Sequence, residues 1–220
     1  MTDRLPYDSA VATGRGDDGT TGLLFGGERI AKDDPRAEAY GTIDEAVSAL
    51  GLVRAELAAK GQYGALGAPL GGLADIVLRL QRELFVVAAE MATNPEARDK
   101  ARDGQTRVDA AMVQGLDALL RETEANVALP REFVVPGETR VSAALEIART
   151  LIRRAERRAV TLDREGLLPS GHVLPYLNRL ADLLWILARA AEQAEAKTAT
   201  RARTTHPRHR RGATAARSDP

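Results

Sequence analysis

The chain has 220 residues, and its 31 Lys and Arg side chains balance its 31 Asp and Glu side chains. A chain of this length buries a sizeable core, and we interpret it as one domain. The balanced charge nominates neither nucleic acid nor a membrane surface as a partner. The absence of cysteine excludes disulfides, thiolate metal sites and a cysteine nucleophile. No segment approaches the roughly 20 apolar residues of a membrane span, so we expect a soluble, cytoplasmic protein.

Residues 1–34 are expected to form a loop region, because glycines recur too often there for a long helix. The stretch from Thr13 to Gly22 offers hydroxyls and closely approachable backbone amides, which a polyphosphate site requires. It lacks the Gly-Lys-Ser/Thr ending of a Walker loop, and such a stretch taken alone is more often a cluster of turns. Lys32 follows shortly and adds a positive charge for the same anion.

Five amphipathic helices are expected in residues 35–197. Asp34 and Pro35 supply an N-cap and an N1 proline for the first, which runs to about residue 60. The second spans about 70–93, and the third about 106–124 with Thr106 as its cap. The fourth spans 139–166, and the fifth runs from about 173 to 197 with Pro175 in its first turn. This pattern, without alternating strands, predicts an all-α five-helix bundle.

Two segments fall outside the helical pattern. The run Phe133-Val134-Val135 lies between prolines, is too short for a helix and has no evident strand partner, so we expect a buried loop. Residues 198–220 carry six arginines against one acid and are predicted to be a disordered basic tail. The arginines around the tail histidines argue against a metal site and leave weak contact with nucleic acid as a secondary interpretation.

The segment Arg149–Arg158 crowds five arginines around one glutamate on the fourth helix. Arg149, Arg153 and Arg157 stand four residues apart and form one stripe, with Glu156 beside it. Like charges at this spacing are unfavourable unless an anion answers them, and phosphate oxygens fit the planar fork of arginine. The alternative is a solvated face whose arginines pair with acids of neighbouring helices or subunits.

Polar residues also interrupt the apolar faces of the first and fifth helices. Asp44 and Glu45 lie among apolar positions of the first, and Asn178, Arg179 and Asp182 interrupt the fifth. Buried polar groups must be satisfied, so we expect these residues to meet the arginines in pairs. For Asp44 and Asp182 a structural salt bridge is equally open. The chain contains neither the Glu-x-x-His pair of di-iron bundles nor the Gly-x-Ser-x-Gly elbow of hydrolases.

Six blocks of sequence together resemble the PduO-type ATP:cob(I)alamin adenosyltransferases, or corrinoid adenosyltransferases, across about residues 11–192. The blocks are Thr13 to Thr21, Lys32 to Pro35, Glu38 to Glu45, Phe133 to Gly137, Arg149 to Arg158 and Tyr176 to Asp182. The resemblance implies a homotrimer of five-helix bundles with ATP and cobalamin bound at subunit interfaces. Cob(I)alamin would attack the 5′ carbon of ATP, giving adenosylcobalamin and triphosphate, so no protein nucleophile is needed. An adenosylcobalamin-dependent enzyme is the expected recipient of the product.

The resemblance also implies roles for individual residues. The amino-terminal loop would wrap the phosphates, which Lys32 would hold, through Thr13, Gly14, Arg15, Gly16, Thr21 and Gly22. The fourth helix would bind ATP through Arg153, Arg154, Glu156 and Arg157, with Glu156 on the Mg²⁺ or ribose side, and Asn178 would contact the nucleotide. Arg149 and Asp44 match a salt bridge between subunits. Phe133 matches an aromatic residue that occupies the lower face of the corrin, displaces the dimethylbenzimidazole and eases reduction of the cobalt.

This sequence departs from the family pattern at several positions. Thr13-Gly14-Arg15-Gly16 stands where Thr-Lys-Thr-Gly is usual, and Ala46, Glu138 and Glu146 replace a common leucine, glycine and histidine. The loop departure motivates a second hypothesis, an adenosylcobalamin-binding carrier or sensor with weakened catalysis. A third is a helical interaction module whose arginines pair only with protein acids.

Overall fold

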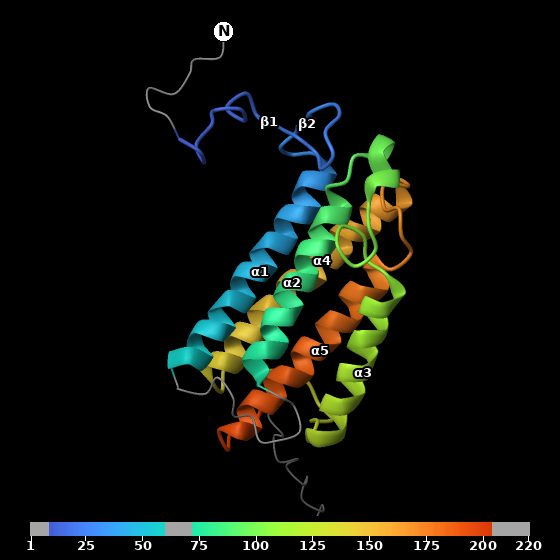
Figure 1. Ribbon diagram of the computed structural model, residues 1–220. Helices are drawn as coiled ribbons and strands as arrows, with labels where there is room; N and C mark the ends of the chain where they lie inside the picture. The colour runs from blue at the N-terminus through green and yellow to red at the C-terminus, as the bar shows by residue number, and fades with distance from the viewer. Residues whose placement is uncertain (1–8, 60–71, 204–220) are drawn as a thin grey trace, which may run out of the picture.

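Five long helices lie side by side in an elongated bundle in the computed structural model, which describes residues 9–59 and 72–203 (Figure 1). They are α1 (Pro35–Ala59), α2 (Leu73–Met91), α3 (Ala110–Asn126), α4 (Arg140–Arg164) and α5 (Val173–Ala194). A short 3-10 helix, η1 (Pro95–Lys100), follows α2. The predicted all-α five-helix bundle is therefore confirmed.

Helix α4 holds the bundle together because it packs against both α1 and α5, while α2 packs on α1 and α3 on α5. Its buried face combines small and branched side chains, among them Ala148, Ile152, Ala155 and Ala159. Small residues let the neighbouring backbones approach closely, and the apolar surface they bury supplies the main favourable free energy of packing. The arginines of α4 are left on the remaining faces.

Local side-chain contacts set the helix starts. The Asp34 carboxylate accepts from the Arg36 amide at 2.8 Å, ahead of Pro35, as the sequence predicts. The hydroxyl of Thr139 accepts from the Ser142 amide at 3.0 Å and begins α4. The prediction for α3 was wrong, because its cap is Asp109, whose carboxylate accepts from the Met112 amide at 2.9 Å. Thr106 instead accepts from a backbone amide of the preceding turn.

Two pairs of very short strands join segments outside the helices. The antiparallel pair β1 (Thr20–Thr21) and β2 (Ile30–Ala31) closes the amino-terminal loop, and β3 (Val134–Val135) pairs antiparallel with β4 (Thr200–Arg201).

The second pair corrects two predictions. The Phe133 run is not a buried loop, because Val134 and Val135 form a strand and Phe133, directly before it, is 86% exposed. Thr200 and Arg201, inside the predicted tail, pair with that strand. Strands of two residues are too short to show alternation, so periodicity could not find them. The rest of the predicted tail, 204–220, lies outside the described residues.

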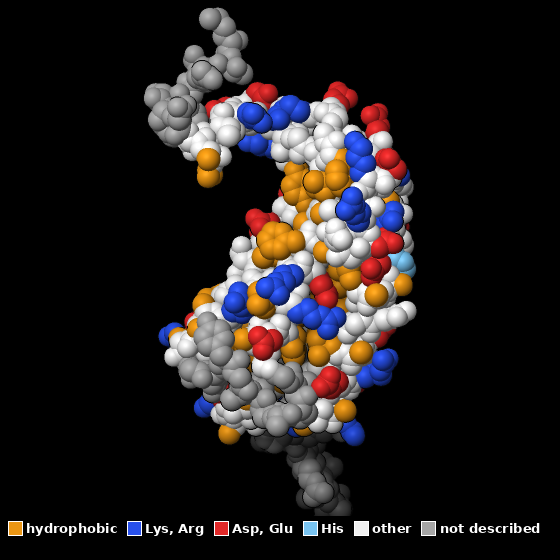
Figure 2. Space-filling model, in the orientation of Figure 1, with side chains coloured by type: hydrophobic (Ala, Val, Ile, Leu, Met, Phe, Trp, Pro, Cys, Tyr) orange, Lys and Arg blue, Asp and Glu red, His pale blue; other side chains and the backbone are white. Residues whose placement is uncertain are grey.

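The amino-terminal segment extends sideways from the end of the bundle where α1 begins (Figure 1). Figure 2 shows that the surface is hollowed below this segment on the same face. Within the described ranges, no helix combines the length and the apolar character needed to cross a membrane.

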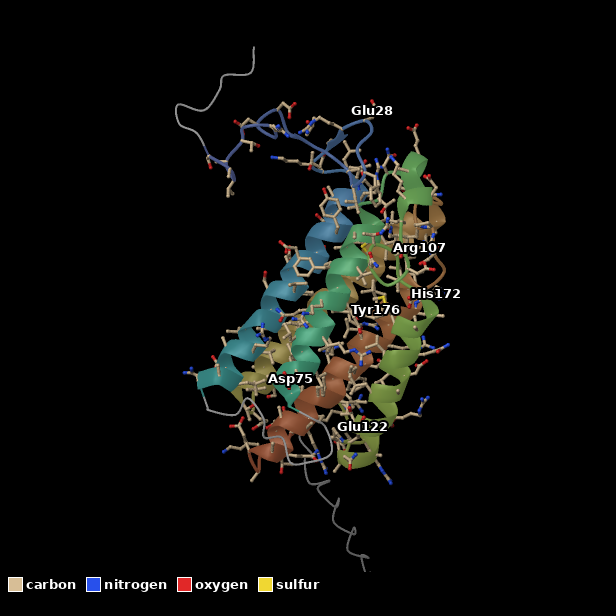
Figure 3. The ribbon with its side chains drawn as sticks, in the orientation of Figure 1. Glu28, Asp75, Arg107, Glu122, His172 and Tyr176 are labelled. Atoms are coloured by element: carbon tan, nitrogen blue, oxygen red, sulfur yellow. The ribbon has the colours of Figure 1, made fainter. Side chains whose placement is uncertain are left out.

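Two buried polar contacts tie loops and helices together on the side of α2. The hydroxyl of Tyr176, a buried side chain of α5 labelled in Figure 3, donates to the Glu83 carboxylate at 2.8 Å. Glu90, fully buried on α2, accepts from the amides of Val108 at 2.6 Å and Ser170 at 3.0 Å. Burial raises the pKa of Glu90, and its hydrogen bonds to these residues oppose the rise. Glu90 thus joins the segments that lead into α3 and α5.

We expect Glu90→Gln to lower the free energy of unfolding by about 1–3 kcal/mol, because an amide nitrogen would then face a backbone N–H. The pKa of Glu90 is higher in the folded chain, so its contribution to stability is largest below the ordinary carboxyl pKa and falls as pH rises through the folded pKa. The gap between parent and variant should therefore shrink from pH 4 to pH 8 in urea unfolding followed by circular dichroism. Glu96→Gln, at an exposed acid, is the control; a gap independent of pH would contradict this assignment.

Candidate functional site

Two neighbouring cavities open between α3, α4, α5 and the β3 segment. The first, here called the strand cavity, has a volume of about 440 Å³ and is bordered by the segment that contains Phe133 and by Glu146. The second, the helix cavity, has a volume of about 630 Å³ and is bordered by Arg153 and Asp182. Arg149 and Trp185 line both cavities and so form the wall between them.

Trp185 is a site residue that sequence reasoning missed. It is the single tryptophan of the chain and stands three residues after Asp182, which places both on one face of α5. The apolar run around it made it look like core. A helical-wheel comparison with Asp182 was the signal that could have found it.

Four of the five clustered arginines pair with acids of the same chain. The shortest distances are 2.6 Å for Arg149 to Glu146, 3.2 Å for Arg153 to Glu156 and 3.3 Å for Arg158 to Glu38, and Arg154 pairs with Glu45. Arg157 donates to the Arg153 carbonyl at 2.9 Å and meets no carboxylate within the described part of the chain. Part-exposed pairs contribute at most about 1 kcal/mol each, so an arriving polyphosphate can compete for these guanidinium groups.

The ion pairs also divide the arginines between two faces of α4. Arg154 and Arg158 reach across to α1, whereas Arg149 and Arg153 face α5 and the helix cavity. The structure thus brings together part of the predicted stripe on the side of the cavities.

Residues predicted to bind one nucleotide meet beside the helix cavity. Asn178 donates to Glu156 at 3.2 Å, and Glu156 pairs with Arg153. Desolvation raises the pKa of Asp182, the charge of Arg153 opposes the rise, and that of Glu156 adds to it. The expectation that Arg179 meets the stripe was wrong, because its guanidinium pairs with Asp117 of α3.

The two acids of α1 are exposed, which corrects the expectation that they are buried. Ile43 and Ala46 face the core. Each residue along an α-helix is rotated by about 100°, so Asp44, which follows Ile43, and Glu45, which precedes Ala46, lie on the outer face. Glu45 finds Arg154 there. The expected pair of Arg149 with Asp44 joins two subunits, so it stays a prediction.

The amino-terminal loop brings Lys32 against Gly16. A Cβ placed on Gly16 would lie 3.0 Å from the Lys32 Nζ, so the amine lies directly over that glycine. Asp18 accepts from both the amide and the hydroxyl of Thr20, and these bonds hold the pKa of Asp18 below its usual value. The loop therefore carries a lysine and hydroxyl groups on a turn that the hydrogen bonds between Asp18 and Thr20 stabilise.

Two features of this loop were not anticipated. Gly14 has φ of 69°, a left-handed conformation that favours glycine over the lysine common in related sequences. Arg29 donates from Nε to the Thr20 hydroxyl at 2.7 Å and from Nη2 to the Arg15 carbonyl at 2.7 Å. Arg29 therefore fastens the loop, although no motif marked it.

Within one chain the loop and the arginines of the cavities do not meet. The loop precedes Pro35, whereas Arg154 pairs with Glu45, which lies about 15 Å further along α1 at 1.5 Å per residue. Arg149 and Arg153 lie at this level of α4 or beyond it.

A chain of ion pairs, with three buried members and the half-buried Arg149, supports the wall between the cavities. Arg189, 1% exposed, pairs with Glu192 at 2.7 Å and with Glu146 at 3.2 Å, and Glu146 pairs in turn with Arg149. The Arg189 guanidinium also lies 5.6 Å from the centre of the Trp185 ring. We call these four charged residues the buried relay. Sequence reasoning missed Arg189 because it stands in an alanine-rich stretch.

Glu156 offers little to a metal ion by itself. One of its oxygens accepts from Asn178 and the other lies 3.2 Å from Arg153. Across residues 9–59 and 72–203, no group of three or more His, Asp or Glu side chains gathers as a metal site. The assignment of Glu156 to the Mg²⁺ or ribose side stays a prediction.

Comparisons with known proteins agree on one family. The sequence model described as cobalamin adenosyltransferase matches residues 11–191. The chain is 37% identical over 182 residues to a corrinoid adenosyltransferase of Citrobacter freundii, covering 83% of this chain and 94% of that protein. It is also 37% identical over 186 residues to a corrinoid adenosyltransferase of Mycobacterium tuberculosis, covering 82% and 88% respectively.

Solved structures of one enzyme share the fold. A variant of the PduO-type adenosyltransferase from Lactobacillus reuteri complexed with ATP gives a TM-score of 0.71 at 28% identity, covering 86% of this chain and 98% of that chain. A second variant, complexed with cobalamin and ATP, gives 0.69 at 28% identity, covering 86% and 97%.

Arg189→Ala should lower the free energy of unfolding by about 3–5 kcal/mol, because it leaves the buried carboxylate of Glu192 without its ion pair and removes one of the two cations beside Glu146. Chemical denaturation with urea measures the loss. The matched control is Arg179→Ala, which breaks a part-exposed pair with Asp117 and should cost at most about 1 kcal/mol. An equal decrease in the free energy of unfolding in the two variants would show that the buried relay contributes no more to stability than a part-exposed ion pair.

Proposed function

The chain belongs to the cobalamin adenosyltransferase family, and we propose that it transfers the 5′-deoxyadenosyl group of ATP to the cobalt of cob(I)alamin. A cobalt–carbon bond forms at C5′ while the bond from C5′ to the triphosphate oxygen breaks, and the electron pair leaves with triphosphate. The observation that carries the proposal is the pair of cavities sharing the wall of Arg149 and Trp185, beside the Phe133 strand. An adenosylcobalamin-dependent enzyme would receive the product.

We assign the corrin to the strand cavity. Phe133 is 86% exposed, and a large aromatic side chain left in water at the edge of a cavity is typical of a binding surface. A flat macrocycle would cover the ring and gain apolar contact with it. Placed at the lower face of the corrin, Phe133 would displace the dimethylbenzimidazole, so that the cobalt loses an axial ligand and is reduced more easily.

We assign ATP to a site shared by two chains. The loop with Lys32 would hold the triphosphate from one subunit, and Arg153, Arg157 and Asn178 would reach it from the partner subunit. Three observations support this division: the separation of Arg153 from the loop along α1, the hollow below the loop in Figure 2 and the guanidinium of Arg157, which meets no carboxylate in the described part of the chain. A homotrimer with Asp44 of the partner subunit facing Arg149 fits them, since Glu146 occupies only Nε of that guanidinium.

The protein's part in the reaction is then positioning and charge neutralisation. Cationic donors fixed in advance stabilise the charge that builds on the departing triphosphate, and holding the two substrates together removes most of the entropic barrier. Magnesium would arrive on the triphosphate rather than in a protein-built site. The carrier or sensor alternative rests on Gly14 and Arg15, which depart from the family pattern in the loop; tight corrinoid binding without turnover would favour it.

The first test is turnover. Purified protein with ATP, Mg²⁺ and chemically reduced cobalamin should form adenosylcobalamin and triphosphate in equal amounts. Arg153→Ala should lower the rate at least about 100-fold, because it removes a fixed cation from the leaving group. Arg107→Ala, which breaks the exposed pair with Asp103, should leave the rate unchanged. Absence of product from the parent protein would refute the proposed reaction.

The second test separates reduction from transfer. Phe133→Ala should spare turnover of pre-reduced cob(I)alamin more than turnover that starts from cob(II)alamin with a chemical one-electron reductant in the assay, because the aromatic ring is assigned to exposing the cobalt for reduction. Both rates are followed by the absorbance change of the corrin. Equal loss in the two assays would place Phe133 in general packing instead.

A further inference from the structure

The strand that carries Phe133 is held from outside by residues beyond α5. β3 has only two residues, and a strand of that length has no stability of its own. Its register pairs Val134 with Arg201 and Val135 with Thr200, and the Ala202 amide donates to the Phe133 carbonyl at 2.8 Å. The backbone of Phe133 is therefore fixed while its side chain stays exposed.

Side chains fasten both ends of this pairing. Before β3, Glu132 lies 3.6 Å from the guanidinium of Arg201. After β3, the Glu138 carboxylate accepts from the amide of Thr200 at 3.2 Å and also from its hydroxyl. A glycine at position 138, which the family pattern favours, could make neither of the last two contacts.

The approach to β3 is held from α5 as well. The Gln193 side-chain amide accepts from the Ala128 amide at 3.1 Å and donates to the Ala128 carbonyl at 2.7 Å. The end of α5 thus hydrogen-bonds to the start of the stretch from Ala128 to Val135, and the segment after α5 pairs with its end. Residues 200–202 lie beyond the span 11–191 that the family model matches.

We propose that residues 200–202, here called the strap, together with Glu138, are positioning residues that hold Phe133 at the edge of the strand cavity for the corrin. The inference rests on the proposed function and deepens it. An aromatic ring meets a macrocycle face productively only within a narrow range of positions, and a short exposed strand without the strap would sample many. Holding the strand in advance spares the ordering cost when the corrin binds.

The test uses the full chain with Ala202→Pro, which removes the N–H that donates to Phe133. The control is Thr198→Pro, which places the same ring in the exposed approach to β4. Turnover from cob(II)alamin should fall on the order of tenfold in Ala202→Pro, with KM for ATP within about twofold of the parent. The double variant Phe133→Ala with Ala202→Pro should be no slower than Phe133→Ala alone, because the strap acts through that ring.

A measurement of corrinoid binding tests the role of the strap independently of the proposed reaction. Trp185, the single tryptophan, lines the strand cavity, so quenching of its fluorescence by hydroxocobalamin reports corrinoid binding. Ala202→Pro should weaken this binding on the order of tenfold, and Thr198→Pro should not. A parent that binds corrinoid without turnover refutes the reaction, and the binding comparison still decides the strap.

Three results would contradict the proposed role of the strap. The first is equal corrinoid affinity and equal turnover in the two proline variants, and the second is unchanged corrinoid affinity and cob(II)alamin turnover in Ala202→Pro. The third is a double variant whose loss of turnover is the sum of the losses in the two single variants. Glu138→Gln gives a milder check, because its amide oxygen still accepts from Thr200. It should retain more affinity than Glu138→Ala.

Discussion

A guanidinium group buried away from water must form ion pairs with carboxylates, and the interior of this bundle is arranged around one such group. Arg189 is answered by Glu192 on its own helix and by Glu146 on α4. Because Glu146 belongs to the other helix, the relay fixes the rotation of α4 against α5. That rotation determines which arginines of α4 face the cavities and which face α1.

The consequences reach the whole candidate site. With Glu146 turned inward, Arg149 stands at the wall between the cavities, and Arg153, one turn later, enters the helix cavity. Arg154 and Arg158 are left to pair with the acids of α1. The arginine cluster therefore contains structural ion pairs and ligand-binding candidates, so its two interpretations apply to different arginines.

Prediction from sequence succeeded where the deciding interactions are local. The five helices follow from apolar spacing, and the starts of α1 and α4 follow from Asp34 and Thr139, whose side chains act within one turn. The resemblance to the family implied that Arg153, Glu156 and Asn178 lie together, and the structure places the three side chains in contact. The exposure of Asp44 and Glu45 was misjudged, since apolar neighbours in sequence do not show which side of a helix faces the core.

The sequence by itself determined the helical bundle, because propensity, capping and spacing act over a few residues. It also indicated the family, through the resemblance of six sequence blocks. Only the tertiary structure decided that Trp185 and Arg149 share a wall, that Arg189 is buried between two acids and that residues after α5 form a strand with the Phe133 segment. Those contacts join positions far apart in the chain. Their free energy depends on the packing that closes the intervening loops, and no local pattern in the sequence records it.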